Sequence, residues 1–196
     1  MAQLDEVGRT LLKAASNLLA HEGPGALTVR RIANDAGMST MNVYSRFGSK
    51  DGVVDHLFIE GFELLAAEMN HVPTTDQPLV DLVGCRDAYR RFARGHSTHY
   101  SVMFERAVPD FQPSPAATTV GLHTLAILAR RLERAMDTGD LARSDPDTAA
   151  AVMWSTCHGV VSLELKGIEP GHIDWSDVYV RATDAVIAGL SVAATR

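Results

Sequence analysis

The stretch LTVRRIANDAGMSTMNVYSRFGSKDGVV, residues 27–54, decides how the amino-terminal part of this chain folds. Thr28 is a good N-cap residue for a short helix, and Gly37 supplies the left-handed turn that ends it. Ser39 is expected to cap a further short helix, residues 40–47. Two short helices joined by a tight glycine-bearing turn predict a helix-turn-helix.

The second of these helices has one apolar face and one polar face. Val43 and Phe47 are four residues apart, so they share the inward face. Rotation of about 100° per residue places the remaining side chains outward or on the flanks: Met41, Asn42 and Ser45 point outward, with Thr40 and Arg46 beside them. A short helix divided in this way suits the major groove of DNA.

Outward from this motif, helical periodicity dominates the chain, and no alternating run bounded by hairpin turns appears. Ser49 is expected to cap a long helix that links the head to the rest of the chain. Helices are predicted at residues 4–21, 28–36 with the cap, 40–47, 50–71, 79–95, 97–106, 116–136, 146–166 and 175–194. The sequence therefore predicts an all-α fold of about nine helices. It has a three-helix head over residues 1–52, a linking helix 50–71, and a body over residues 72–196.

Lys50 stands in the first turn of the linking helix, which is the wrong end for a cation. A lysine there opposes the helix macrodipole and costs a few tenths of a kcal/mol. The placement makes sense if Lys50 and the helix N-terminus together hold an anion such as a DNA phosphate.

Charge is divided unevenly along the chain, which carries a net charge of −6. Residues 1–52 have six Lys and Arg against five Asp and Glu, whereas the remainder has twelve against nineteen. The acidic excess lies in the body, so a DNA-binding head is compatible with the composition, with modest non-specific affinity.

The composition also limits the class of protein. Hydrophobic residues make up 46%, enough for a real core. Two cysteines without CxxC spacing argue against a disulfide framework or a cysteine zinc site, and they fit a reducing cytoplasm. The N-terminus lacks signal-peptide features, and the uncharged stretch 148–163 is too short to span a membrane.

These features resemble the DNA-binding head of the tetracycline-repressor (TetR) family. The matching residues, in order, are Leu27-Thr28, Ile32-Ala33, Ala36-Gly37, Ser39, Tyr44-x-x-Phe47 and Ser49-Lys50. The resemblance implies phosphate contacts for Thr28, Tyr44 and Lys50. It implies base-edge contacts for Arg30, Thr40, Met41 and Asn42, and it places Ser39 in the same DNA-contacting set. Two positions depart from the family: Arg46 stands where His is frequent, and Ser45 where a bulky residue often follows the Tyr.

The body resembles a TetR C-terminal subtype named for its Trp-His-Gly residues. The matching pieces are residues 89–93 (YRRFA), 100–104 (YSVMF), and Trp154, His158 and Gly159. Aromatic, Met and a few polar side chains there suit a small, mostly apolar effector. The candidate ligand residues are Phe62, Phe92, His96, Met103, Phe104, Thr119, His123, Trp154 and His158.

Several residues have a structural interpretation beside the functional one. Trp154 and His158 share a helical face, so they either line a pocket or pack in the core with the imidazole bonded to backbone. The arginines of the seventh helix are expected on a solvated face: Arg130, Arg131 and Arg134. Neither the adjacent Cys157 and His158 nor the pair His96 and His99 is expected to form a nucleophilic or metal site. No enzyme, metal or cofactor is predicted.

The last two helices predict a homodimer. The 148–163 stretch is weakly polar nearly all round, so it must be covered on more than one side. Small residues at helical spacing in the final helix permit close helix approach: Ala182, Val186, Gly189 and Ala193. Two helices per subunit, 146–166 and 175–194, would form a four-helix interface. We therefore expect a ligand-responsive repressor that binds a near-palindromic operator. The alternative is a helical small-molecule-binding or protein-interaction module without sequence-specific DNA binding.

Overall fold

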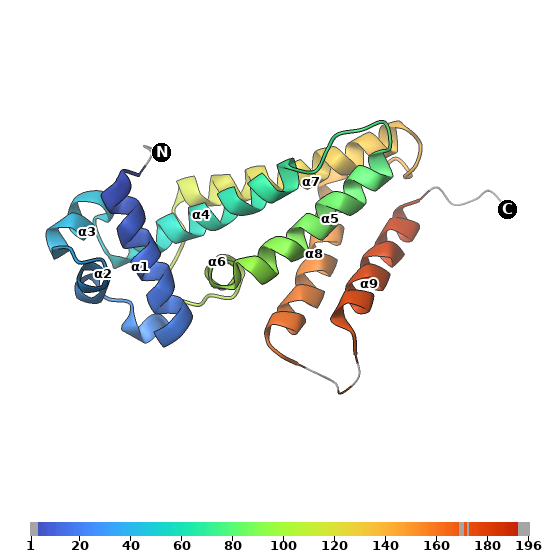
Figure 1. Cartoon of the computed structure of the whole chain (residues 1–196). Helices are drawn as coiled ribbons and strands as arrows, with labels where there is room; N and C mark the ends of the chain where they lie inside the picture. Colours follow the sequence, from blue (N-terminus) through green and yellow to red (C-terminus); the bar gives the residue numbers. More distant parts are fainter. Residues whose placement is uncertain (1–3, 169–170, 172, 192–196) are drawn as a thin grey trace. The chain divides into compact units, whose positions relative to one another are not determined.

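The computed structural model describes residues 4–168, 171 and 173–191. Within them all regular secondary structure is helical, apart from an isolated bridge between Leu141 and Ser191. This confirms the predicted all-α fold (Figure 1). The helices are α1 (Glu6–Glu22), η1 (Pro24–Ala26), α2 (Val29–Asp35), α3 (Thr40–Phe47), α4 (Lys50–Asn70), α5 (Pro78–Gly95), α6 (Ser97–Phe104), α7 (Pro115–Asp137), α8 (Pro146–Leu165) and α9 (Trp175–Leu190).

The predicted helix boundaries agree with the structure to within two residues, except at the end of α9. There Ser191 is extended and caps a helix that ends at Leu190, short of the expected end at residue 194. Residues 192–194 lie outside the described part of the chain. The 3₁₀ turn η1 was not predicted, because a Gly-Pro-Gly sequence indicates only that a helix stops.

The chain packs as two compact units. Of the described residues, one unit contains those up to Glu63 together with His96–Gly121, and the other contains Leu64–Gly95 together with those from Leu122 onward. Helices α4 and α7 each contribute one part to each unit. The functional division into a head at residues 1–52 and a body at 72–196 stays a prediction.

The core of the first unit is built where α1, α2 and α3 meet. Leu11, Ile32 and Val43 are fully buried, one from each helix. The turn between α2 and α3 closes because Gly37 adopts a φ of 67° and the Met38 amide donates to the carbonyl of Ala33 at 2.8 Å. The three helices therefore form the predicted helix-turn-helix arrangement.

A second glycine brings α4 close to the end of α3. A Cβ added at Gly52 would lie 1.8 Å from the backbone oxygen of Phe47, so only glycine fits at this approach. The ring of Phe47 meets that of His56 edge-on, with centroids 4.9 Å apart. The predicted cap is confirmed, because the Gly52 amide donates to Ser49 Oγ at 3.1 Å.

The arginines of α7 correct the expectation of a solvated face. Arg131 is buried and donates to the carbonyls of Val72 at 2.6 Å and Pro73 at 2.7 Å, which satisfies backbone groups beyond the end of α4. Arg134 donates to the buried carboxylate of Asp81 at 2.9 Å. Helical spacing cannot foresee these partners, because they come from a loop and another helix. Arg130 is exposed, as expected.

Helices α8 and α9 lie side by side and antiparallel in the second unit (Figure 1). The buried face of α8 consists of Ala149, Ala150, Met153, Cys157 and Val161. Its other face is open within the chain: Val152 is 45% exposed and Leu163 is 43% exposed. The chain by itself therefore covers α8 on one side only. Among the described residues, no helix is long and apolar enough to cross a membrane.

Candidate nucleic-acid interface and ligand site

The outward face of α3 presents large side chains to solvent. Val43 and Phe47 are buried, as their spacing predicts. Met41 is 70% exposed and Tyr44 is 53% exposed, which is unusual for side chains of this size. Thr40 and Ser45 are also exposed. This face therefore presents the thioether side chain of Met41, two hydroxyl groups and the aromatic ring of Tyr44 to a partner.

Thr28 and Arg30 lie at the start of α2. Thr28 Oγ1 accepts from the Arg31 amide at 3.2 Å, which confirms the predicted cap. The cap uses a lone pair of the hydroxyl, so its hydrogen can still be donated to a phosphate. The neighbouring Arg31 forms a two-bond ion pair with Glu22, at 2.7 and 3.1 Å. Arg30, by contrast, is exposed. Of the two adjacent arginines, Arg31 is therefore the one tied to Glu22.

A chain of four side chains joins α3 to the start of α1. Arg46 donates from Nε and a terminal nitrogen to both carboxylate oxygens of Asp5, at 2.8 and 2.6 Å. Its other terminal nitrogen donates to Asn42 Oδ1 at 3.2 Å, and Asn42 Nδ2 donates to Ser39 Oγ at 3.2 Å. Ser39 occupies the N-cap position of α3, as predicted. Its side chain accepts no hydrogen bond from a backbone amide, however, so the expected side-chain cap is not formed.

Asp5 performs two functions at once. Its Oδ1 also accepts the Gly8 amide at 2.7 Å, so it is the N-cap of α1. The hydrogen bond from Arg46, followed by that from Gly8, lowers the pKa of Asp5 to about 2. In the sequence Arg46 stands out as a departure from the family, whereas nothing in it points to Asp5. Two residues 41 positions apart leave no periodic signal for their pairing.

Lys50 stands at the first position of α4 and is half-exposed. Its Nζ lies 3.8 Å from Asp51 Oδ1, which is at the outer limit of an ion pair. A contact so long and solvated contributes little, so the ammonium can turn to an approaching anion. Lys50 therefore lies in the first turn of α4, and its phosphate contact stays a prediction.

The predicted ligand residues are divided between the two units. Phe62, His96, Met103, Phe104 and Thr119 belong to the first unit, and Phe92, His123, Trp154 and His158 to the second. In the first unit, Phe62 and Phe104 meet edge-on with centroids 5.5 Å apart, next to Phe58 and Tyr100. These rings form a packed aromatic cluster.

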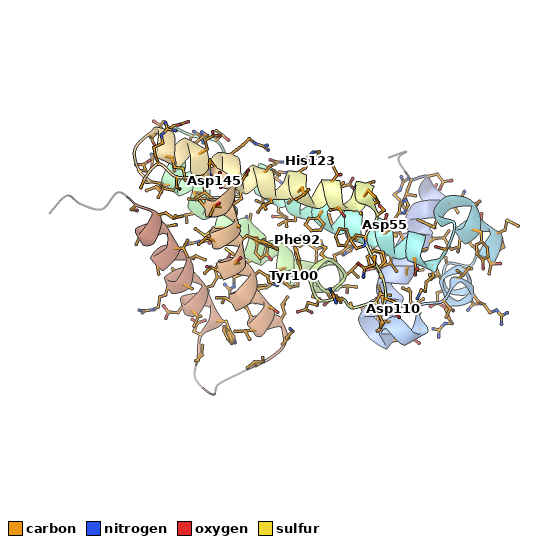
Figure 2. The ribbon with its side chains drawn as sticks, turned by 180° about the vertical axis from the view of Figure 1, so that it is seen from behind. Asp55, Phe92, Tyr100, Asp110, His123 and Asp145 are labelled. Carbon is orange, nitrogen blue, oxygen red and sulfur yellow. The ribbon has the colours of Figure 1, made fainter. Side chains whose placement is uncertain are left out.

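The polar members of the predicted set have different environments. Thr119 is exposed and donates to the Pro115 carbonyl at 2.9 Å, and His123 is exposed on α7 (Figure 2). Trp154 and His158 are partly buried with ring centroids 5.8 Å apart, and His158 Nδ1 lies 3.3 Å from the Tyr89 hydroxyl. The imidazole therefore has a side-chain partner from α5.

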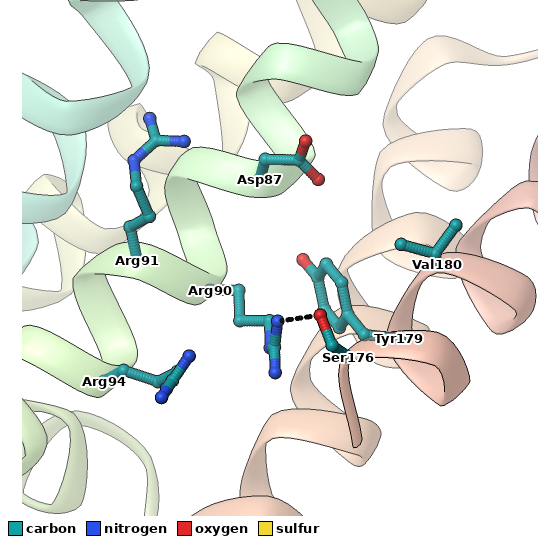
Figure 3. Close-up of a pocket in the computed structure, with 7 residues that line it drawn as sticks. All are labelled: Asp87, Arg90, Arg91, Arg94, Ser176, Tyr179 and Val180. Carbon is teal, nitrogen blue, oxygen red and sulfur yellow. Dashed lines mark hydrogen bonds between the residues drawn. The ribbon is translucent and has the colours of Figure 1, made fainter. Parts of the chain in front are cut away.

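A pocket of about 380 Å³ opens between α5 and α9 (Figure 3). It includes none of the predicted ligand residues, and its lining is rich in arginine: Asp87, Arg90, Arg91, Arg94, Ser176, Tyr179 and Val180. Arg90 is held by two bonds to Glu164, at 2.8 and 2.9 Å, by the Ser176 hydroxyl at 3.0 Å, and by the Tyr179 ring beneath it. One wall of the pocket is therefore a fixed ion pair.

The cysteine thiols and the pair His99 and Glu60 are further groups with possible chemical reactivity. Cys85 and Cys157 are buried free thiols, and burial raises the pKa of each to about 11, so little thiolate forms at neutral pH. His99 Nε2 lies 2.9 Å from Glu60 Oε2. Across the described ranges, no three His, Cys, Asp or Glu side chains converge on a possible metal position.

Comparison with known families matches both parts of the chain. A family profile described as "Bacterial regulatory proteins, tetR family" matches residues 11–57. A second, described as "Tetracyclin repressor-like, C-terminal domain", matches residues 82–186, which is more than half of the chain. The first match contains α2, α3 and the turn between them.

Individual proteins are similar over nearly the whole chain. An uncharacterized HTH-type transcriptional regulator of Mycobacterium tuberculosis is 23% identical over 184 residues, which cover 92% of this chain and 80% of that protein. A solved protein of unknown function from Rhodococcus sp. RHA1 has a TM-score of 0.83 at 23% identity and covers 97% of this chain and 98% of its own. The fatty acid degradation regulator FadR of Bacillus halodurans has a TM-score of 0.79 at 16% identity, with coverages of 96% and 98%. At these identities the solved structures establish the fold.

Proposed function

Because the chain belongs to the tetracycline-repressor family and is a DNA-binding transcriptional regulator, we propose that it represses transcription as a homodimer. It binds a near-palindromic operator and is released when a small molecule favours a body conformation unsuited to DNA. The DNA-contacting residues of this proposal are Thr28, Arg30, Ser39, Thr40, Met41, Asn42, Tyr44 and Lys50.

The observation that carries the proposal is the outward face of α3. Met41 and Tyr44 are more than half exposed on a helix whose opposite face is fully packed. A methionine can contact the thymine methyl group, and an asparagine can pair with adenine through two hydrogen bonds. In this proposal Tyr44, within α3, and Lys50, at the first position of α4, supply phosphate contacts.

Selection of DNA fragments from a randomised library by the purified protein tests this function. We expect enrichment of an inverted repeat, because a two-fold dimer reads two equivalent half-sites. Tyr44→Ala serves as the comparison and is expected to bind the enriched fragments more weakly. A protein that enriches no sequence would instead be the helical binding or interaction module that the sequence leaves as the alternative.

The outward faces of α8 and α9 support the dimer part of the proposal. Val152 and Leu163 on α8 are 45% and 43% exposed, and they share a helical face with Gly159. At Gly159 and Gly189, an added Cβ would meet nothing within 4 Å. An open apolar surface interrupted by glycine permits close helix approach and needs a partner to cover it. A second copy of the chain is that partner in our proposal.

We propose a small, mostly apolar effector and assign the body to the Trp-His-Gly subtype on the residues Trp154, His158 and Gly159. The chemical composition of the predicted set, aromatic and methionine side chains with a few polar groups, is what supports an apolar ligand. The arginine-lined pocket between α5 and α9 would instead favour an anion. A thermal-shift screen with matched pairs such as benzyl alcohol and benzoate separates the two. Stabilisation by the anions alone, lost in Arg94→Gln, would contradict an apolar effector.

We further propose that the protein acts in the cytoplasm and has no enzymatic activity. Two buried free cysteines with raised pKa values are consistent with a reducing compartment and offer no nucleophile. Because regulation requires only binding equilibria, the proposed function needs no catalytic group.

A further inference from the structure

The amide of Asn42 is held from both sides in the free protein. Arg46 donates to its Oδ1, and its Nδ2 donates to Ser39 Oγ, each at 3.2 Å. A guanidinium carries only donors, so the Asn42 atom that faces Arg46 must be the oxygen. The donor end of the amide therefore points toward the start of α3 and the acceptor end toward its finish.

This arrangement leaves Asn42 able to read a base. The amide nitrogen has two hydrogens and the oxygen two lone pairs, and the contacts to Ser39 and Arg46 use one of each. One donor and one acceptor therefore remain, which is the pair that adenine requires in the major groove at N7 and N6. The order in which these two groups meet the protein reverses when an A·T pair becomes T·A.

An amide free to turn by 180° can match either order, because the turn exchanges its nitrogen and oxygen. A held amide matches one order. We propose that Asp5 is a specificity-determining positioning residue: through Arg46 it holds the Asn42 amide in one orientation, so that the regulator distinguishes A·T from T·A at one base pair of each half-site. This inference rests on the proposed function, since it assumes that α3 reads DNA.

Asp5 is required because Arg46 has a competing attraction. A guanidinium on the DNA side of the head would otherwise turn to a phosphate, which it binds with the same two-bond geometry. Asp5 already accepts two hydrogen bonds from the Arg46 guanidinium, at 2.6 and 2.8 Å, in the free protein. Asp5 is itself fixed in position because it caps α1 through the Gly8 amide. With its pKa at about 2, the carboxylate stays ionised wherever DNA binding is measured.

The same carboxylate repels DNA phosphates, so Asp5 lowers the affinity for DNA in general while it increases the discrimination between sites. These two effects can be measured separately. Removing the charge raises affinity for all DNA, because less repulsion opposes the phosphates. Removing the hold on Asn42 lowers the ratio of affinities for the A·T and T·A sites and leaves the rest of the sequence preference in place.

Asp5→Asn tests the proposal, because asparagine is an equally good N-cap and keeps α1 intact. Glu6→Gln is the matched control: it removes the same charge one residue away, from a side chain exposed in the first turn of α1. The probes are the operator selected by the wild-type protein and a version with A·T exchanged for T·A at the base pair that Asn42→Ala identifies. Fluorescence anisotropy measures each affinity.

In the wild-type protein we expect roughly 5- to 150-fold discrimination between the two sites. Asp5→Asn is expected to reduce that ratio at least about threefold, whereas Glu6→Gln leaves it unchanged and raises both affinities. Arg46→Met should lower the ratio as Asp5→Asn does, but should weaken binding to both DNAs because it removes a cation. These opposite effects on affinity separate positioning from charge.

An unchanged ratio in both Asp5→Asn and Arg46→Met would overturn the inference. Failure of the wild-type protein to select any DNA would instead overturn the proposed function, so the two failures are distinct. Circular dichroism of each variant shows whether the head has kept its helices. If either Asp5→Asn or Arg46→Met has lost them, the ratio is compared in the other variant alone.

Discussion

The outward face of α3 and the outward faces of α8 and α9 are both exposed, but their side chains differ in chemical type. On α3, polar side chains are bonded to one another and to the start of α1. On α8, the exposed Val152 and Leu163 lie beside open space at Gly159, and α9 adds open space at Gly189 together with the exposed charges of Asp177, Arg181 and Asp184. The first face fixes the direction of donors and acceptors, and the second leaves room for another helix.

The difference teaches what each face is suited to bind. A polar face with oriented hydrogen-bonding groups recognises a partner by its pattern of donors and acceptors and tolerates water at the contact. A face of small apolar residues gains from close packing and from removing apolar surface from water, and it does not tolerate a charge. Substitutions can therefore break one face while leaving the other intact.

Gly189→Arg has the largest expected effect on this comparison. Because an added Cβ at Gly189 meets nothing within 4 Å, the chain itself should fold with arginine there. In a dimer the side chain would be buried without a partner charge at both copies, which costs about 3–5 kcal/mol. We expect the dimer dissociation constant to rise at least about 100-fold, as measured by analytical ultracentrifugation.

Gly95→Arg is the control, since it adds the same charge at another open position, at the end of α5. It should remain dimeric. A Gly189→Arg protein that sediments like the wild type would show that α9 does not form the interface.

Gly52→Ala has the next largest effect and contrasts a closed glycine with an open one. The new methyl would lie 1.8 Å from the Phe47 carbonyl oxygen, and backbone cannot move aside as a flexible side chain does. We expect a loss of about 3 kcal/mol in the stability of the head, with weakened operator binding. Gly95→Ala, where the space is open and which lies outside the proposed dimer interface, should leave stability unchanged or raise it by about 0.5–1 kcal/mol. Thermal unfolding followed by circular dichroism compares the two, and equal midpoints would contradict the close approach.

Lys50→Ala has the smallest expected effect and sharpens the comparison within the DNA-binding face. Losing one phosphate contact should weaken binding to every sequence alike and lower the salt slope by about one unit per subunit. Asn42→Ala is the comparison: it should cost about 1–3 kcal/mol on the operator and relax the preference at one base pair. Anisotropy titrations at several salt concentrations distinguish the two. An unchanged salt slope for Lys50→Ala would leave the lysine at the start of α4 unexplained.

Most of the fold could be predicted from the sequence because its determinants are local. Thr28, Gly37 and Ser49 act within a few residues of themselves, and the spacing of Val43 and Phe47 defines the inward face of α3. The outward direction of Met41 follows from the same rotation. These features depend only on helix geometry, so a single sequence is enough to find them.

The features that the sequence did not reveal depend on distant partners. Arg131 is buried because the carbonyls of Val72 and Pro73 lie beside it, and nothing within α7 distinguishes it from the exposed Arg130. Asp5 and Arg46 meet across 41 residues, and Ser39 exchanges its expected backbone amide for the side chain of Asn42. A polar residue has several possible partners, and only the fold decides among them.

The burial of Cys85 and Cys157 has a practical consequence for studying the regulatory motion. Both thiols are buried, with pKa values of about 11, and the chain has no other cysteine. A cysteine introduced at Asn17, which is exposed on α1 and outside the proposed DNA-contacting set, would therefore react alone with a maleimide dye at neutral pH, without prior removal of the native thiols. In a dimer such a label appears once on each head. Energy transfer between the two dyes would then report the separation of the heads directly, with and without operator and effector.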